Sequence, residues 1–252
     1  MCSAMVSRYL TISVDDGHPT DFRSADLLSR FALKATFYVP KENPERAVIA
    51  ENQIQELSNH FELGGHTIRH IPLKDLDDET AFLEIKNGKK WLEDVSGKPV
   101  TAFCYPRGKF NSRTPQLVRK AGFAGARTCM FNLFEFPKDP YLWGLSTQAY
   151  THSIRLPFQQ ALFGGNYKGA LNFIRVNKFS TNWTRHFLGV LDHVEENGGI
   201  AHLYFHSWEI ELTNQWCQLK ETLRNASERK NFIRLTNGEL FNLRPTKARP
   251  HQ

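Results

Sequence analysis

Residues 64–70 have the sequence GGHTIRH, and this segment constrains the fold more than any other part of the chain. His66 and His70 lie four residues apart, after two glycines and an apolar run, and this spacing is typical of two ligands for one metal ion. A histidine pair alone is a modest signal, because such pairs also arise by chance. The interpretation therefore depends on the sequence on either side.

Three other segments share one sequence pattern, in which polar residues follow a short apolar run. They are residues 11–18 (TISVDDGH), 103–108 (FCYPRG) and 202–208 (HLYFHSW). In parallel α/β architectures, functional side chains gather outside the carboxyl ends of the strands. The sequence therefore predicts that these segments and the histidine pair meet at one end of a sheet.

Apolar runs and helical periodicity alternate along most of the chain. Strands are expected at residues 9–14, 35–39, 61–63, 100–105, 200–205 and 232–233. Helices are expected at residues 24–31 (with Ser24 as the cap), 52–61, 77–92, 114–121, 185–196 and 214–226. Short connections between these elements favour a single domain with a mostly parallel sheet or barrel.

The composition is that of an ordinary globular protein, with 252 residues, 40% hydrophobic and 23% charged. No run approaches the roughly 18 apolar residues that span a bilayer, and the first residues lack the apolar core of a secretory signal. The four cysteines are widely spaced without a CxxC motif, which indicates reduced thiols. A cytoplasmic location is the expectation.

The net charge of +6 would suit an acidic partner such as a phosphate, a nucleic acid or an anionic membrane. The basic residues are scattered among acids and apolar residues, so a solvated surface is the simpler interpretation. We expect no nucleic-acid partner and no transmembrane segment. Peripheral contact with an anionic membrane or with a phosphate-bearing substrate stays open, as does the oligomeric state.

Residues 128–182 break the regular pattern and are rich in aromatic residues mixed with Gly, Pro and Asn. We expect an elaboration with short helices over one end of the barrel. Its aromatic side chains are expected to form its own core rather than to stack on sugar faces. The domain is predicted to cover residues 1–245, followed by a disordered tail at 246–252.

One carboxylate and two imidazoles form the ligand set of a catalytic zinc or a similar divalent ion. At the turn onto Gly17, Asp15 and Asp16 can both face the site, so one can bind the metal and the other can act as a base. His206 then fits a general acid that protonates a leaving amine. Taken singly, Asp-Asp-Gly is a common turn and His206 could be a core histidine, so the joint order and spacing carry the interpretation.

In that order, the motifs resemble the polysaccharide deacetylase (NodB-homology) family, carbohydrate esterase family 4. Residues 14–17 (VDDG) match its first motif, residues 66–70 (HTIRH) its second, and residues 203–206 (LYFH) its fifth. The resemblance implies a single-domain distorted (β/α) barrel and a metal-dependent hydrolase that removes an acetyl group from a sugar.

The resemblance also implies a role for each matching residue. Asp15 would be the catalytic base and His206 the acid, while Asp16, His66 and His70 would bind the metal. Leu203 would line the pocket for the acetyl methyl group. The further candidates for substrate contact are Tyr105, Arg107 and Trp208.

The third motif departs from the family pattern, Phe-Arg-x-Pro-Tyr-Gly, because residues 103–108 read FCYPRG. Cys104 replaces the arginine that pairs with the base, and Arg107 takes the tyrosine position. The Arg107 backbone N–H could still face the oxyanion, and its guanidinium could bind substrate or reach Asp15. The fourth motif, which orients the acid histidine, is not recognisable; Glu209 and Asp139 are the candidates for that task.

The implied function is removal of an N-acetyl group, in preference to an O-acetyl group, from an amino sugar in a glycan or glycan precursor, by attack of metal-bound water. Zn²⁺ suits the ligand set best, and Co²⁺, Ni²⁺ or Fe²⁺ would fit the same geometry. Two alternatives remain. The same site could hydrolyse another C–N bond, as a deformylase or cyclic amidase does, or the chain could be a degenerate member that binds glycan without turnover.

Overall fold

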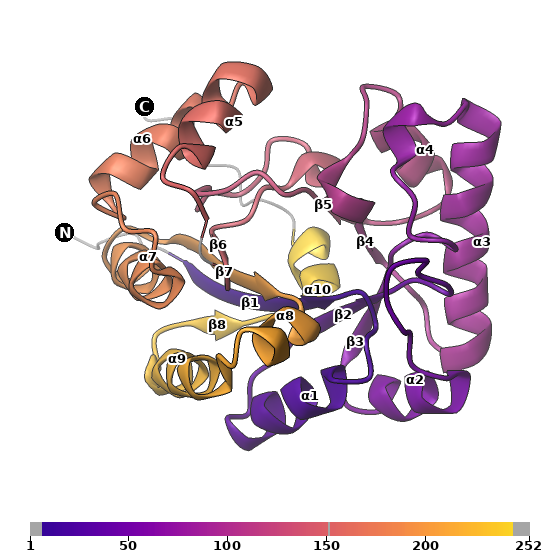
Figure 1. Cartoon of the computed structure of the whole chain (residues 1–252), viewed down its shortest axis with the longest axis horizontal. Coiled ribbons are helices and arrows are strands. Elements are labelled where there is room, and N and C mark those ends of the chain that lie inside the picture. The colour runs from indigo at the N-terminus through magenta and orange to yellow at the C-terminus, as the bar shows by residue number, and fades with distance from the viewer. Residues whose placement is uncertain (1–6, 151, 244–252) are drawn as a thin grey trace, which may run out of the picture.

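A curled parallel sheet organises the chain in the computed structural model, which describes residues 7–150 and 152–243. Its strand order is β5-β4-β3-β2-β1-β7-β6, and β8 pairs with the first residues of β1. All of these pairings are parallel. The sheet follows the sequence from β1 to β5 with a helix before each new strand, as expected for a partial (β/α) barrel (Figure 1).

The strands are β1 Arg8–Asp15, β2 Thr36–Val39, β3 Glu62–Gly65, β4 Ala102–Cys104, β5 Gly125–Arg127, β6 Thr147–Gln148, β7 Gly199–Phe205 and β8 Ile233–Arg234. The helices are α1 Asp21–Arg30, α2 Glu51–Ser58, α3 Asp78–Ser96, α4 Thr114–Lys120, α5 Leu156–Gly164, α6 Tyr167–Arg175, α7 Trp183–Asn197, α8 Ser207–Leu212, α9 Trp216–Glu228 and α10 Asn237–Asn242. Three short 3-10 turns lie at Leu73–Asp75, Pro106–Gly108 and Pro140–Leu142.

The two faces of the sheet differ in chemistry because side chains alternate along each strand. On β1, Leu10, Ile12 and Val14 belong to the main core that the surrounding helices complete. The intervening Thr11 and Ser13 hydroxyls instead lie 2.7 Å and 3.1 Å from the two ring nitrogens of His202 on β7. The outer face is therefore apolar and the inner face carries a buried polar network, which ends at Asp15.

Helix α10 packs against the inner face of the curled sheet. The Asn237 amide donates to the Tyr38 hydroxyl at 2.8 Å, and the Gly238 N–H donates to Glu62 at 3.0 Å. Gly64 has to be glycine here, because a Cβ atom would lie 2.4 Å from the Tyr38 ring. Because Glu62 is the first residue of β3, α10 covers the amino end of the sheet, and the cavity described below lies at the carboxyl end.

Most predicted elements are confirmed, with shifted boundaries. Helix α1 begins at Asp21, so Ser24 is a buried helix residue and the prediction that it caps the helix is wrong. The helix predicted at residues 77–92 is α3, and Asp77 is its cap, with the side chain accepting from the Thr80 N–H. Strand β5 and helices α8 and α10 were not predicted, because three to six residues carry too little periodicity.

Residues 128–182 form an elaboration that contains β6, α5 and α6 (Figure 1). The expectation that its aromatic residues form a core is correct for one group: Phe131, Phe134, Tyr141, Trp143 and Phe173. It is wrong for a second group, which is exposed: Tyr150, Phe158, Phe163, Tyr167 and Phe179.

Three further expectations concern the end of the chain, the cysteines and membrane-spanning helices. Residues 246–252 and Cys2 lie outside the described residues. Cys104, Cys129 and Cys217 are free thiols, as the spacing indicates. Across the part of the chain that the structure describes, no helix combines the length and apolarity that crossing a bilayer requires.

Candidate active site

Asp16, His66 and His70 come together just beyond the carboxyl ends of β1 and β3. Asp16 Oδ1 lies 3.6 Å from His66 Nε2 and 3.2 Å from His70 Nε2, and one potential ligand atom from each residue lies within 4.8 Å of the others. All three residues are buried. Asp16 Oδ1 has no hydrogen-bond partner among the described residues, although it is shielded from solvent. An acceptor left in this way fits a bound cation.

The two imidazoles are prepared to act as ligands. His66 Nδ1 lies 2.8 Å from the Cys104 carbonyl oxygen, and donating there leaves the Nε2 lone pair facing Asp16. Burial lowers the pKa of His70, so its ring is neutral, which is the form that binds metal. Burial alone would raise the pKa of Asp16, but the nearby His66 and His70 rings outweigh it and hold that pKa well below its usual range.

Trp208 holds the second oxygen of Asp16. Its indole N–H donates to Asp16 Oδ2 at 2.9 Å, and the Arg46 guanidinium lies 4.0 Å from the centre of its ring. Trp208 was predicted as a substrate contact. Its N–H fixes a candidate metal ligand, a role that partners of metal ligands commonly have; Trp208 also lines the cavity described below, so contact with a substrate stays a prediction.

The backbone around this cluster adopts a conformation that side chains rarely take. Asp16, Thr67, His70 and Arg107 all have positive φ, with values of 83°, 67°, 53° and 55°. Left-handed backbone at non-glycine residues costs free energy and gathers at functional sites. At Asp16, which follows β1, the left-handed backbone turns the side-chain carboxylate towards His66 and His70.

Arg127 is the charged partner of Asp15. Its Nη2 forms a buried ion pair with Asp15 Oδ2, and the guanidinium lies 4.4 Å from the centre of the Tyr204 ring and 5.3 Å from that of Tyr38. Burial would lower the pKa of Arg127, but the Asp15 carboxylate outweighs it, so the guanidinium stays charged. The other oxygen, Asp15 Oδ1, has no hydrogen-bond partner among the described residues.

The arginine that is missing at position 104 is thus replaced from the neighbouring strand. Cys104 on β4 pairs in register with Arg127 on β5, and Arg127 Nη2 lies 3.0 Å from Cys104 Sγ. Cys104 leaves room for the guanidinium to reach the same carboxylate. Sequence reasoning missed Arg127 because strand β5 has only three residues, although a strand was due after the helix that ends at Lys120.

His206 is paired with Glu209, one of the two candidates for orienting it. His206 Nδ1 donates to Glu209 Oε2 at 2.6 Å, and Nε2 lies 3.9 Å from Asp16 Oδ2. Burial would lower the pKa of His206, but Glu209 and Asp16 raise it to about 9. Asp139, the other candidate, instead accepts from the Tyr141 N–H.

A second trio, Asp15, His66 and Cys104, also has the spacing of metal ligands. It is a poor donor set, because burial raises the pKa of the Cys104 thiol and keeps it protonated. Asp15 is also already neutralised by Arg127. The Asp16 trio is therefore the candidate metal centre.

One cavity brings most of the predicted residues together. It is lined by Asp15, Asp16, Glu45, His66, His70, Tyr105, Arg107, Cys129, Gln148, Tyr204, His206 and Trp208. The structure does not bring Leu203 to this cavity, because Leu203 pairs with Ile12 on the outer face of the sheet and packs in the main core. Tyr204, the next residue, faces the cavity instead.

Arg107 and Tyr105 line the cavity in ways that limit their roles. The Arg107 guanidinium pairs with Glu45 at the rim, so in this conformation it does not reach Asp15. The Tyr105 hydroxyl donates to the Tyr141 carbonyl at 2.8 Å, and its ring stacks on Phe110 at 4.6 Å. Any contact of Tyr105 with a substrate would therefore come from the backbone or the ring edge.

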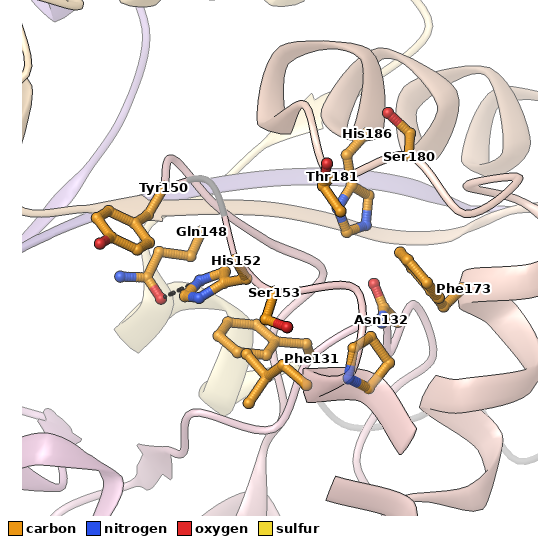
Figure 2. Close-up of a pocket in the computed structure, with 12 residues that line it drawn as sticks. Phe131, Asn132, Gln148, Tyr150, His152, Ser153, Phe173, Ser180, Thr181 and His186 are labelled. Atoms are coloured by element: carbon orange, nitrogen blue, oxygen red, sulfur yellow. Dashed lines mark hydrogen bonds between the residues drawn. The ribbon is translucent and has the colours of Figure 1, made fainter. Parts of the chain in front are cut away.

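Gln148 lines both this cavity and a second, smaller pocket that is formed largely by the elaboration (Figure 2). His152 Nε2 donates to Gln148 Oε1 at 2.8 Å, and the Asn132 and His186 side chains face the same pocket. Burial lowers the pKa of His152 to about 4 and that of His186 to about 3, so both rings are neutral. The pocket lining therefore mixes polar and apolar side chains and carries no charge.

Comparisons with known proteins agree with this geometry. Residues 4–126 match the family model of the polysaccharide deacetylases. A peptidoglycan-N-acetylglucosamine deacetylase from Bacillus cereus is 26% identical over 134 residues, which cover 52% of this chain and 60% of that protein. The chain thus spans less than two thirds of the length of this curated relative.

Two solved structures share the fold across nearly the whole chain. A protein from Mycobacterium smegmatis assigned to the polysaccharide deacetylases has a TM-score of 0.65 at 15% identity, covering 95% of this chain and 91% of its own. A family 4 acetyl xylan esterase from Clostridium thermocellum, in complex with a cobalt ion, has a TM-score of 0.58 at 14% identity, covering 93% and 90%.

These matches and the residues gathered at the end of the sheet point the same way. The family model covers β1 to β5, which supply Asp15, Asp16 and the histidine pair. The structural likeness extends through β7, which leads into His206. Residues 4–126 thus match the polysaccharide deacetylase family, and nearly the whole chain shares the fold of solved proteins that carry this family's name.

Proposed function

We propose that this protein is a metal-dependent hydrolase that removes the N-acetyl group from an amino sugar in a glycan or glycan precursor. The observation that carries the proposal is the placement of the Asp16–His66–His70 cluster between two prepared acid–base groups, Asp15 with Arg127 and His206 with Glu209. The relative named for peptidoglycan-N-acetylglucosamine deacetylation supports the same class of substrate.

Asp16, His66 and His70 would hold a divalent cation, and the unpartnered Asp16 Oδ1 and the neutral His70 ring fit that role. A bound cation supplies Lewis acidity, which polarises the substrate carbonyl and lowers the pKa of water. Two imidazoles and one carboxylate suit Zn²⁺ best, with Co²⁺, Ni²⁺ and Fe²⁺ as the other candidates.

Asp15 is proposed as the base. Its Oδ1 is free to accept a proton from the attacking water, while the ion pair with Arg127 fixes the carboxylate in position. The Arg107 backbone N–H, held by the left-handed turn after Pro106, is the candidate donor to the developing oxyanion.

His206 is proposed as the acid, and its charge state favours an amide substrate. An amine leaves far less readily than an alcohol without a proton, so N-deacetylation demands a proton donor. Because Glu209 and Asp16 raise the pKa of His206 to about 9, the ring is protonated at neutral pH and can supply that proton. This supports N-acetyl in preference to O-acetyl chemistry.

The test is acetate release from N-acetylglucosamine oligomers, a nucleotide-linked sugar and a lipid-linked sugar, each with and without a chelator. We expect chelator-sensitive release from at least one substrate. Asp15→Asn and His206→Ala are expected to abolish it, and His193→Ala, on the far side of β7 in α7, is expected to leave it unchanged.

The alternatives give different outcomes in the same assay. Formate or ring-opened product without acetate, still sensitive to chelator, would move the scissile bond to another C–N group. Failure of every substrate together with failure to bind a metal would leave a degenerate glycan-binding member. Arg127 and Glu209 weigh against degeneracy, since each supplies a partner for a catalytic group.

Glu209→Gln is expected to shift the alkaline limb of the pH–activity profile towards lower pH. The protonated His206 acts as the acid, so activity should fall as pH rises through its pKa of about 9. Removing the negative Glu209 stabilises the neutral ring and lowers that pKa. The measurement is kcat against pH from 6 to 10 on a substrate found by the acetate assay.

Glu211→Gln is the matched control for this shift. Glu211 lies in the same helix, α8, but bonds to Arg23 and Trp216 rather than to His206. Its profile should overlay the wild-type profile. An unchanged alkaline limb in Glu209→Gln would exclude His206 as the titrating acid.

A further inference from the structure

Large apolar side chains are exposed in one region to an unusual degree. Leu162, Phe163 and Tyr167 are 70%, 83% and 70% exposed. Six more residues between positions 150 and 179 are exposed to between 39% and 47%: Tyr150, Ile154, Phe158, Leu171, Ile174 and Phe179. So many large exposed apolar side chains within one stretch of about 30 residues indicate an interaction surface rather than ordinary surface scatter.

The most exposed of these residues form the tip of a helical hairpin, α5 and α6 (Figure 1). Gly164 and Gly165 make the turn, and a Cβ atom added at either position would meet nothing within 4 Å. By contrast, Phe173 and Ala170 on α6 are buried against the rest of the elaboration. The hairpin is therefore anchored by one face and presents the other, together with its tip, to the surroundings.

The charge of this region is of one sign. Residues 140–191 contain no aspartate or glutamate and five basic residues: Arg155, Lys168, Arg175, Lys178 and Arg185. Lys168 pairs with Glu135 at 2.8 Å, whereas Arg175 and Lys178 make no ion pair with any residue that the structure describes. Exposed aromatic and aliphatic side chains, interspersed along this segment with lysine and arginine and without acidic residues, complement an anionic bilayer surface.

The hairpin also borders the route to the active site. Phe163 and Gly164 line a groove together with Lys109 and Phe110. This groove shares Arg107 and Cys129 with the catalytic cavity. A surface bound at the tip would therefore lie at the end of a groove that leads to Asp15 and Asp16.

We propose that the α5–α6 hairpin docks on an anionic lipid bilayer, with Leu162, Phe163 and Tyr167 inserted among the headgroups and the basic side chains paired with lipid phosphates. Contact between two copies through the same patch is disfavoured, because it would bring two clusters of like charge together. Docking of this kind does not depend on the reaction at the cavity, so it can be tested separately from the proposed function.

The test is flotation of the full chain with vesicles of phosphatidylcholine containing 30% phosphatidylglycerol, and with vesicles of phosphatidylcholine alone. We expect binding to the anionic vesicles that weakens as salt is raised. The triple variant Leu162→Ser, Phe163→Ser, Tyr167→Ser should bind at least about tenfold more weakly. Replacing Arg175 and Lys178 with glutamine should weaken binding about fivefold for each charge removed.

The matched control is Leu83→Ser with Leu212→Ser, which removes exposed apolar side chains from helices outside the hairpin. It should float like the wild type, and circular dichroism should confirm that all variants are folded. Absence of wild-type flotation would overturn the proposal, as would equal flotation of the triple variant. Dimerisation in light scattering that the triple variant abolishes, without flotation, would assign the patch to a second copy of the chain.

Discussion

Replacing Arg127 with methionine is expected to lower the free energy of unfolding by about 3–5 kcal/mol and activity by at least about 100-fold. Arg127 is fully buried and pairs with the buried Asp15, so its loss leaves an uncompensated charge inside the curl of the sheet. The same loss frees the carboxylate that is proposed as the base. Chemical denaturation and steady-state kinetics measure the two effects.

Arg119→Met is the matched control, because Arg119 also lies over a tyrosine ring and near a carboxylate but is exposed. It should change stability by less than about 1 kcal/mol. The family pattern provides a rescue as well. Cys104→Arg in an Arg127→Ala background returns the guanidinium to the third motif, and it should recover part of the lost activity. Full activity in Arg127→Met would show that the ion pair with Arg127 is not needed to position Asp15 for the reaction.

Asp16→Asn is expected to abolish stoichiometric metal binding and to lower activity by at least about 1,000-fold. Asp16 Oδ1 is the only charged donor in the candidate metal centre among the described residues, and an amide oxygen is a weaker ligand. Zinc at 100 times its Kd should stabilise the wild-type chain by about 3 kcal/mol, which raises Tm by about 5–10 °C. The variant should show no such rise.

Elemental analysis and a thermal melt with and without chelator make this measurement independent of any substrate. Asp26→Asn serves as control, because Asp26 is exposed on α1 and pairs only with Arg30 among the described residues. A variant at Asp16 that keeps both the bound metal and the thermal shift would mean that the cation binds elsewhere.

The scaffold could be predicted from sequence because its long elements carry periodic signals. The apolar run of β1 and the amphipathic α3 give the alternation of strand and helix, and the strand ends then bring Asp15, Asp16, His66 and His70 to one edge. His206 follows for the same reason, because β7 is parallel to β1 in full register. These placements depend only on strand order and direction.

Arg127 and Leu203 show where the same reasoning fails. Arg127 reaches Asp15 because β5 lies beside β4 in one particular register, which a three-residue strand does not reveal in sequence. Leu203 was assigned to the pocket by motif position, but the alternation of side chains on β7 turns it outward and Tyr204 inward. The placements of both residues depend on the register of a strand and on which face of it a side chain occupies. The sequence predicts that a strand is present more readily than it predicts these two properties.

The left-handed residues at the cavity have a consequence for directed evolution. Asp16, Thr67, His70 and Arg107 each hold a backbone shape that glycine or asparagine would accept at lower cost. A library screened for heat resistance alone would therefore be enriched in glycine at these positions. The most thermostable clones would then lack candidate metal ligands such as Asp16 and His70. A screen on this scaffold therefore needs catalytic turnover as a second criterion.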